Sequence, residues 1–411
     1  MQPESVRRRS ALLALAAVVG PGVLAGLSDD DPAGITTYSI LGADYGYRLL
    51  WVLLLSTVAL ILFHELGARM GIVTGQGLTG LIRERYGVRP AALAVTALLA
   101  ANVGTMCAEF AGVAASLQLA GVTRYASVPV AAVGVSLLVL RGSFHRIEHV
   151  LLVLSTIFGA YILAGFLAHP DWGATARGLA VPGLPLTKHA ILIATATVGT
   201  TLAPWGLAFI QSYAVDKRLM PRDLRFERVD VAVGAVMTGV IGLFVVIACA
   251  ATLHKTGRSI HDAKDAAVAL KPLAGSLAST LFGAGLLGAA LLAASILPLS
   301  TAYSVSEAIG HDAALDDKLR EAPVFYGTFG LVVVVAAVII LIPGAPLVPI
   351  LFLTQALNAV LLLPLLAFVY GISRDRDLMG EHASGRLGAA ASLLVIALIT
   401  VCVVALLAFS L

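Results

Sequence analysis

The sequence is poor in charge: only 12% of its 411 residues are Asp, Glu, Lys or Arg, whereas 59% are hydrophobic. A water-soluble globule of this length cannot bury so many apolar side chains, so the soluble classes are excluded. The mean hydropathy of +0.95 implies that much of the surface faces lipid. The net charge of +3 comes from short loops between apolar runs and forms no basic patch. A nucleic-acid partner is therefore not predicted.

Cysteine is equally scarce. Cys107, Cys249 and Cys402 lie far apart inside apolar stretches, without C-x-x-C spacing or a nearby histidine partner. A disulfide framework and a cysteine-ligated zinc site are both excluded. His64 and Glu65 begin a possible H-E-x-x-H zinc motif, but Ala68 cannot supply a ligand. No nucleophile and base constellation is present, so we predict neither an enzyme nor a bound cofactor.

Long apolar runs fill most of the chain. A helix needs about 20 apolar residues to cross the hydrocarbon core of a bilayer. The sequence predicts one all-α membrane domain, 1–411, with eleven transmembrane helices at 10–42, 47–71, 91–120, 127–140, 149–168, 191–215, 229–253, 273–309, 324–342, 347–370 and 386–411.

The loop charges predict the orientation. With the N-terminus in the cytoplasm, 18 of the 27 Lys and Arg residues fall inside, beginning with Arg7 to Arg9. Positive charge is retained on the cytoplasmic side, so we expect an inner-membrane protein with its N-terminus inside and its C-terminus outside. The basic start followed by an apolar run also fits a cleaved signal peptide. A first transmembrane helix fits better, because the apolar pattern resumes after Asp31.

The first predicted span is interrupted by the segment Ser28-Asp29-Asp30-Asp31-Pro32-Ala33-Gly34. Each carboxylate at membrane depth costs roughly 3 kcal/mol or more, so such residues usually serve function. Proline removes a backbone donor and glycine adopts unusual dihedrals, which frees carbonyl oxygens beside the carboxylates. The pattern predicts a cation site. The alternative is a solvated loop between two short helices, which would leave a half-helix too short to span.

The sixth predicted span has a similar interruption at Gly199-Thr200-Thr201-Leu202-Ala203-Pro204-Trp205-Gly206. A single proline is often only a kink, but paired interruptions five spans apart indicate an inverted repeat. We expect repeats over about 10–168 and 188–371, with 386–411 as an extra helix. In such folds the substrate binds at the bilayer midplane between the two unwound segments, so the pattern predicts transport.

These residues resemble the Nramp family of divalent metal transporters, which has the LeuT-type fold and an Asp-Pro-Gly-Asn motif on its first helix. The equivalent here is Asp31-Pro32-Ala33-Gly34, and the segments 45–51 and 64–78 are similar to the second-helix region of the family. The likeness continues through Glu109, Pro204, 286–307 and Gln355, so it covers most of the chain.

The resemblance implies a set of site residues. In the family the metal is held by an aspartate and an asparagine of the first helix, a methionine of the sixth, two backbone carbonyls and a glutamine of the tenth. The equivalent residues are Asp31, Gly34, Ala203, the carbonyl oxygens of Ser28 and Thr200, and Gln355. Asp30, Glu109 and Trp205 are expected around the site or in its vestibule, and for Glu109 a purely structural role stays open.

Two family ligands are absent here, because Gly34 replaces the asparagine and Ala203 the methionine. Without a soft thioether, the site should favour hard ions. Magnesium keeps several of its waters, which suits a roomier cavity, and the substitutions look like those of the Nramp-related magnesium transporters. We therefore expect Mg²⁺ as the main cargo, with Mn²⁺ also transported.

Proton coupling is expected to be weak or absent. The family has a histidine after the sixth-helix proline where this chain has Trp205, and Met106 replaces a third-helix aspartate. The span 324–342 also lacks the arginines of the proton-coupled members. The alternatives are a proton-coupled Mn²⁺ or Fe²⁺ transporter and a non-transporting sensor of the same fold. The lipid bilayer and the divalent ion are the only partners predicted, and the oligomeric state is not.

Overall fold

The structure is a computed structural model that describes residues 25–26, 28–140, 156–261, 263–310 and 320–409. All regular secondary structure in these ranges is helical. The α-helices are α3 (Pro32–Tyr45), α4 (Leu50–Thr74), α5 (Leu78–Tyr86), α6 (Val88–Gln118), α7 (Arg124–Leu140), α9 (Ala160–Leu167), α10 (Trp172–Ala180), α11 (Lys188–Thr201), α12 (Pro204–Asp216), α13 (Leu224–Thr252), α14 (Ala263–Ala267), α15 (Lys271–Ala274), α16 (Ala278–Ile309), α17 (Pro323–Leu341), α18 (Leu347–Arg374), α19 (Arg376–Met379) and α20 (Arg386–Ala408). Short 3₁₀ turns are η1 (Thr156–Gly159), η2 (Pro221–Asp223), η3 (His254–Thr256), η4 (Val268–Leu270), η5 (Gly275–Leu277) and η6 (Gly380–His382).

The described residues contain 8 helices that are long and apolar enough to cross a membrane. They coincide with the second, third and sixth to eleventh predicted spans, and the shorter apolar helix α7 coincides with the fourth. The multi-pass membrane architecture is thereby confirmed. Parts of the first and fifth predicted spans, 10–24 and 149–155, lie outside the described residues, so the total of eleven stays a prediction.

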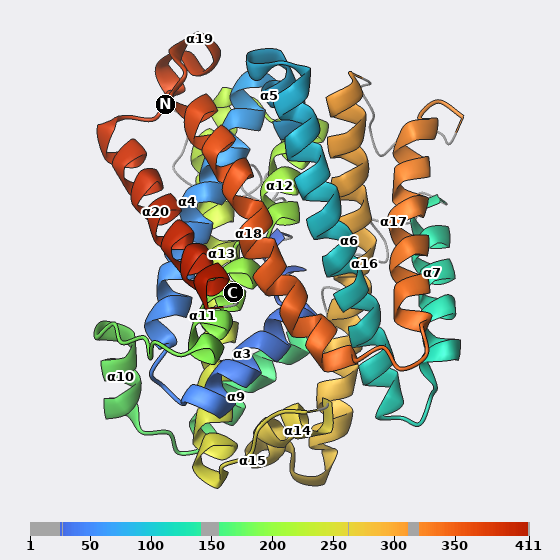
Figure 1. Cartoon of the computed structure of the whole chain (residues 1–411), viewed down its shortest axis with the longest axis vertical. Coiled ribbons are helices and arrows are strands. Elements are labelled where there is room, and N and C mark those ends of the chain that lie inside the picture. The colour runs from blue at the N-terminus through green and yellow to red at the C-terminus, as the bar shows by residue number, and fades with distance from the viewer. Residues whose placement is uncertain (1–24, 27, 141–155, 262, 311–319, 410–411) are drawn as a thin grey trace, which may run out of the picture.

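The connecting segments separate into two ends of the molecule (Figure 1). The short helices α5 and α19 lie at one end, and α10, α14 and α15 lie at the other. The loop charges predict this pairing, since the α5 and α19 loops were both expected on the cytoplasmic side. The direction in which the bundle is inserted stays a prediction from the loop charges.

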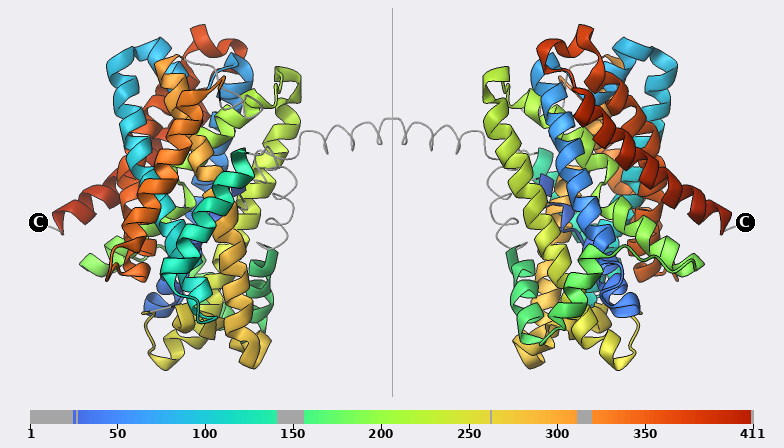
Figure 2. Two further views of the ribbon diagram at one scale, coloured as in Figure 1. Left: turned by 90° about the vertical axis from the view of Figure 1, so that its right-hand side faces the viewer. Right: turned by 90° about the vertical axis from the view of Figure 1, so that its left-hand side faces the viewer.

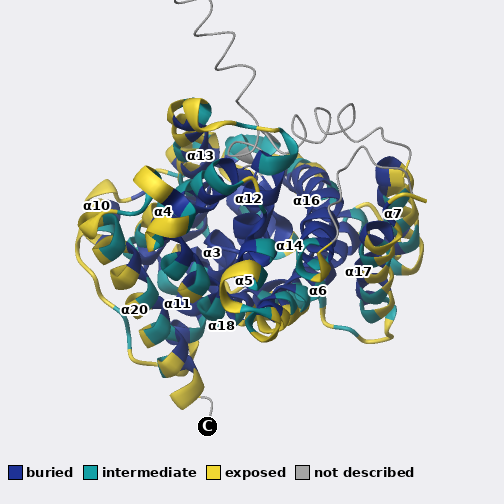
Figure 3. Cartoon of the chain, turned by 90° about the horizontal axis from the view of Figure 1, so that it is seen from above, coloured by how far each residue is buried: buried dark blue, intermediate teal, exposed yellow. Residues whose placement is uncertain are grey.

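The core of the bundle is formed around the broken helices. Viewed from above, α3 and α12 lie in the buried centre, and exposed residues are concentrated on outer elements such as α10 and α7 (Figure 3). In the side views α20 leans away from the bundle at its periphery (Figure 2), in agreement with its being the least buried candidate span.

Small residues bring α4 close to α12. A Cβ at Gly71 would lie 2.6 Å from the carbonyl oxygen of Gln211, and one at Gly67 would lie 3.3 Å from that of Leu207. Because glycines four residues apart share one helix face, the two backbones can approach along this seam. The packing fixes the rotation of α4 and points His64, on the preceding turn, toward the start of α12.

Candidate metal site

The first break is confined to Asp30 and Asp31. Ser28 and Asp29 are still helical, and α3 begins at Pro32. Asp31 is the N-cap of α3, with extended dihedrals (φ −73°, ψ 169°), and its Oδ1 accepts a hydrogen bond from the Gly34 amide at 2.5 Å. The break is narrower than the predicted segment 28–34, because aspartate and proline are favoured at the N-cap and first position of a helix and so restart the helix at once.

The second break is formed by Leu202 and Ala203, between the end of α11 at Thr201 and the start of α12 at Pro204. It too is shorter than the predicted segment 199–206. Ala203 is the N-cap of α12 but has no side-chain acceptor, so proline alone restarts the helix.

The two prolines explain which carbonyls leave the helical ladder. In an α-helix the carbonyl of residue i accepts from the amide of residue i+4. Pro32 stands four residues after Ser28, and Pro204 stands four residues after Thr200. Since proline has no N–H, neither carbonyl can receive its helical hydrogen bond. The carbonyls singled out by resemblance are thus also the two that the local chemistry removes from the ladder.

Gly34 shows that the breaks meet. A Cβ at this position would lie 3.3 Å from Asp31 Oδ1 and 3.3 Å from the Thr200 hydroxyl, and 2.9 Å from the Asp29 carbonyl oxygen. Asp31 and Thr200 therefore flank one small volume that a side chain at position 34 would fill. The structure brings together the predicted residues Asp31, Gly34 and Thr200, all of which are buried.

Two more carboxyl groups lie on the first break. Both carboxylate oxygens of Asp29 and of Asp30 are buried and have no hydrogen-bond partner among the described residues. The C-terminal end of α11, with its partial negative charge, also points at the break. Buried charge without a partner is costly, so a cation would offset it.

Glu109 of α6 adds a further carboxyl group. It is fully buried, and neither of its carboxyl oxygens has a hydrogen-bond partner among the described residues. One turn further along α6, a Cβ at Gly112 would collide with the Pro32 ring, so α6 packs tightly against the first break. The predicted place of Glu109 beside the site is consistent with this packing.

Gln355, Trp205 and Ala203 are three further residues that the sequence predicts at the site. The α18 backbone at Gln355 touches α11, because a Cβ at Gly199 would collide with its carbonyl oxygen. The Gln355 amide is turned to its own helix, where Nε2 donates to Thr354 at 3.2 Å and Oε1 accepts from Asn358 at 3.0 Å. Trp205 is buried, and its indole N–H has no partner among the described residues. Ala203 offers only its backbone.

Sequence reasoning missed a polar stripe on α6. Asn102, Thr105 and Glu109 follow the i, i+3, i+7 spacing of one helix face in an otherwise apolar helix, a signal that was available. Asn102 donates to Thr301 of α16 at 2.8 Å, and Asn358 of α18 donates to Thr105 at 2.9 Å. The stripe leads from the break toward the end of the bundle that carries α5.

The sequence indicates His64 only as part of a possible zinc motif and does not place it beside the breaks. Its Nε2 would lie 3.3 Å from a Cβ at Gly206, and Asp29 Oδ1 would lie 3.6 Å from the same point. The imidazole is buried, and Nε2 has no partner among the described residues. A histidine of α4 therefore stands beside the first turn of α12, next to the position of Trp205.

The donor chemistry at the breaks is almost entirely oxygen. In the described part of the chain, no group of three or more His, Cys, Asp or Glu side chains is arranged to hold a metal ion. A cation would rely on the Asp31 carboxylate, backbone carbonyl oxygens and retained water. Such ligands suit Mg²⁺ and Mn²⁺ rather than metals that require thiolate.

The comparisons agree with this architecture. Residues 22–409 match the profile of the Nramp family, described as natural resistance-associated macrophage protein-like. The chain is 32% identical over 298 residues to a "Divalent metal cation transporter MntH" of Burkholderia ambifaria, a match that spans 68% of this chain and 66% of that protein. It is 29% identical over 397 residues to the protein of the same name from Aeromonas hydrophila, with 93% of each covered.

Solved structures show the same fold. An Eremococcus coleocola manganese transporter superposes with a TM-score of 0.79 at 19% identity, covering 100% of this chain and 88% of that one. The nucleobase-cation-symport-1 family transporter Mhp1 superposes with a TM-score of 0.57 at 16% identity, with 95% and 90% covered. The chain is not an enzyme, as expected. With a family profile matched along nearly its whole length, it belongs to the Nramp family of membrane proteins.

Proposed function

We propose that the protein transports divalent metal cations across the membrane by alternating access around the two breaks. The observation that carries the proposal is the meeting of Asp31 and Thr200 about Gly34, deep in the bundle. Asp31 supplies a negative charge, and the carbonyls of Ser28 and Thr200 supply oxygens that the helical ladder does not use. The names of the MntH relatives support the same substrate class.

Manganese is the leading ion of this proposal. The solved neighbour that superposes with a TM-score of 0.79 is a manganese transporter, and none of the comparisons described above names magnesium. The expectation of Mg²⁺ as main cargo is therefore replaced by its alternative. Oxygen ligands suit Mn²⁺ as well, so the missing thioether at Ala203 does not exclude it. Magnesium remains the second candidate, on the single observation that Gly34 and Ala203 leave no side-chain donor at two positions.

Proton coupling is the second open property. The expectation of weak coupling rested on Trp205, on Met106 and on the lack of arginine in 324–342. It did not include His64, whose imidazole lies near Asp29 beside the first turn of α12. The position of His64 favours the proton-coupled alternative.

The full architecture belongs to the same proposal. Eleven spans, repeats over 10–168 and 188–371, and an extra helix at 386–411 are supported by the paired breaks and by the peripheral position of α20. An inner-membrane location with a cytoplasmic N-terminus is supported by the loop charges.

The test compares two variants that lose the same charge at two helix caps. Asp31→Asn keeps an N-cap side chain but removes the carboxylate from the site. Asp171→Asn makes the identical change at the N-cap of α10, where Asp171 accepts from the Ala174 amide at 2.9 Å, outside the membrane spans. Both proteins are reconstituted in liposomes, and Mn²⁺ and Mg²⁺ uptake are followed with internal dyes.

Asp31→Asn should lose nearly all Mn²⁺ uptake, whereas Asp171→Asn should keep it. Mn²⁺ uptake by the unsubstituted protein should persist in a large excess of Mg²⁺. If Mg²⁺ instead blocks Mn²⁺ uptake and itself enters the liposomes, Mg²⁺ is the main substrate. Acidification of the liposome interior in proportion to metal entry would establish proton coupling. Full uptake by Asp31→Asn would refute the proposed site.

A further inference from the structure

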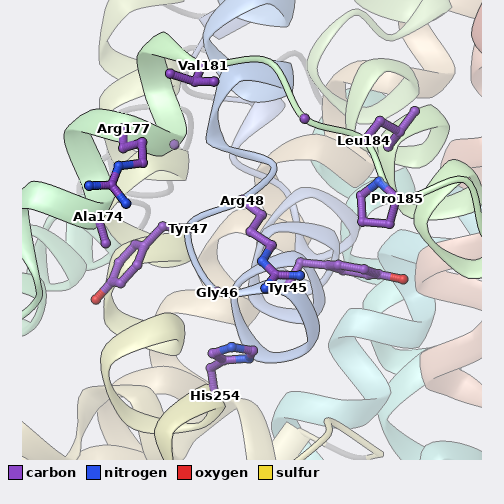
Figure 4. A pocket seen from close by; sticks show the side chains of 12 residues that line it. Tyr45, Gly46, Tyr47, Arg48, Ala174, Arg177, Val181, Leu184, Pro185 and His254 are labelled. Atoms are coloured by element: carbon purple, nitrogen blue, oxygen red, sulfur yellow. The ribbon is translucent and has the colours of Figure 1, made fainter.

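A cavity with basic side chains in its lining lies away from the breaks, at the end of the bundle that carries α10. It has a volume of about 590 Å³ and is lined by the turn between α3 and α4, by α10 and the segment after it, and by His254 of η3. Figure 4 shows the Arg48 side chain in its middle, Arg177 on the α10 side and His254 opposite. A cavity of this size can hold a small ligand or a lipid headgroup.

The charged groups of the cavity are all basic. Its 12 lining residues include Arg48, Arg177 and His254 and no Asp or Glu. Neither guanidinium group forms an ion pair or a hydrogen bond within the described residues. Two carboxylates of the adjoining segments are engaged elsewhere: Asp44 pairs with His189 at 2.9 Å, and Asp171 caps α10. Two unpaired guanidinium groups in one cavity are complementary to an anion.

The walls of the cavity are held in a fixed arrangement. A Cβ at Gly178 would collide with the Tyr47 carbonyl oxygen, so α10 packs directly on the turn between α3 and α4. The His254 ring lies against Gly46, and its Nδ1 donates to the Ala43 carbonyl oxygen at 2.8 Å. Trp51 donates from its indole to the Gly183 carbonyl at 3.3 Å. The basic groups are therefore presented by packed elements rather than by a loose loop.

Exposed apolar and aromatic residues lie beside the cavity. Arg48 stands just before α4, and Leu54 and Val58, one and two turns into that helix, are about half exposed to the lipid side. On the other wall, the exposed Trp172 lies at the start of α10 and packs on Phe166, an exposed residue near the end of α9. Their ring centroids are 5.3 Å apart. Tryptophan is enriched where membrane and water meet, so Arg48 and Arg177 lie near phosphate level.

We propose that this cavity binds the phosphate of an anionic phospholipid, with Arg48 and Arg177 holding the phosphate oxygens and the exposed apolar residues beside them contacting the acyl chains. A guanidinium group can donate two parallel hydrogen bonds to two phosphate oxygens. Apolar residues such as Val181 and Leu184 line the same cavity. By the predicted orientation the lipid belongs to the extracytoplasmic leaflet. The inference goes beyond metal transport and does not depend on it.

The test counts bound lipids on the full chain by native mass spectrometry. The protein is equilibrated with equal amounts of phosphatidylglycerol and phosphatidylcholine. The unsubstituted protein should retain phosphatidylglycerol preferentially. Arg48→Gln and Arg177→Gln should each weaken that retention about tenfold, because each removes one charge-assisted contact. Arg258→Gln, at an exposed arginine of the same end that does not line the cavity, should leave it unchanged.

A double variant that combines Arg48→Gln with Arg177→Gln and still retains phosphatidylglycerol at the unsubstituted level would overturn the proposal. Inorganic phosphate in excess is the second arm: if it displaces the lipid completely and binds the lipid-free protein equally well, the cavity is a site for a free anion and the lipid assignment is wrong. A third measurement needs no substitution. Brominated phosphatidylglycerol should quench the fluorescence of Trp51 and Trp172 more than brominated phosphatidylcholine, and equal quenching would count against a headgroup site.

Discussion

The hydroxyl groups of Tyr38 and Thr201 lie 2.9 Å apart and connect the two broken helices close to their breaks. The Thr201 hydroxyl donates its own proton to the Thr197 carbonyl oxygen at 2.8 Å, so Tyr38 must be the donor to Thr201. Both residues are fully buried. This bond joins α3, the second half of the first broken helix, to α11, the first half of the sixth. The two halves should move as one body when the site opens.

Tyr38→Phe removes this bond with little change of volume. A buried hydrogen bond contributes on the order of 1 kcal/mol to stability, so the melting temperature of the purified protein should fall by a few degrees. The rate of metal uptake should fall by more than this small loss of stability explains, because α3 and α11 can then separate. Tyr125→Phe, at an exposed tyrosine, is the matched control and should change neither property. If Tyr38→Phe transports at the full rate with an unchanged melting temperature, the two helices are not coupled through this bond.

Much of the fold follows from local chemistry in the sequence. Long apolar runs predict spans whose ends agree with the structure to within a few residues, as at 347–370 against Leu347–Arg374. The two breaks follow from Asp31-Pro32 and Ala203-Pro204, because proline both removes a donor and starts a helix. These features depend only on neighbours along the chain.

The features that sequence reasoning missed depend on helix rotation and packing. His64 approaches Asp29 only because Gly67 and Gly71 fix the face that α4 turns to α12. The Gln355 amide turns toward Asn358 because the two side chains form a hydrogen bond within α18. The spacing of apolar residues in the sequence does not predict such a bond. The cavity under α10 combines residues from three distant segments, and no spacing rule relates Arg48 to Arg177.

Pro204→Ala tests whether the second break is needed for transport. Alanine at position 204 supplies a backbone N–H that can donate to the Thr200 carbonyl oxygen, so α11 and α12 can join in one continuous helix. Pro204 stands at the first position of α12, where proline is well tolerated, so the variant should keep a melting temperature close to that of the unsubstituted protein. Metal uptake should nevertheless fall to a small fraction, because the Thr200 carbonyl would be engaged.

The matched control is Pro323→Ala, at the same first helical position of the unbroken span α17. It should transport normally. A fully active Pro204→Ala variant would mean that the Thr200 carbonyl is not a ligand, or that the break survives without proline. Infrared measurement of backbone hydrogen exchange at the break distinguishes these two explanations.

Ala203→Met tests whether position 203 faces the ion. Methionine would add a soft thioether to a donor set that is otherwise oxygen, and thioethers favour transition metals over magnesium. Competition of Mn²⁺ and Cd²⁺ against Mg²⁺ in liposome uptake should shift toward the softer metals, by about tenfold for a gain of one ligand contact. Ala203→Leu fills a similar volume without sulfur and separates ligation from size. If Met and Leu change the selectivity equally, the effect is steric, and if neither changes it, residue 203 lies outside the ion's contact shell.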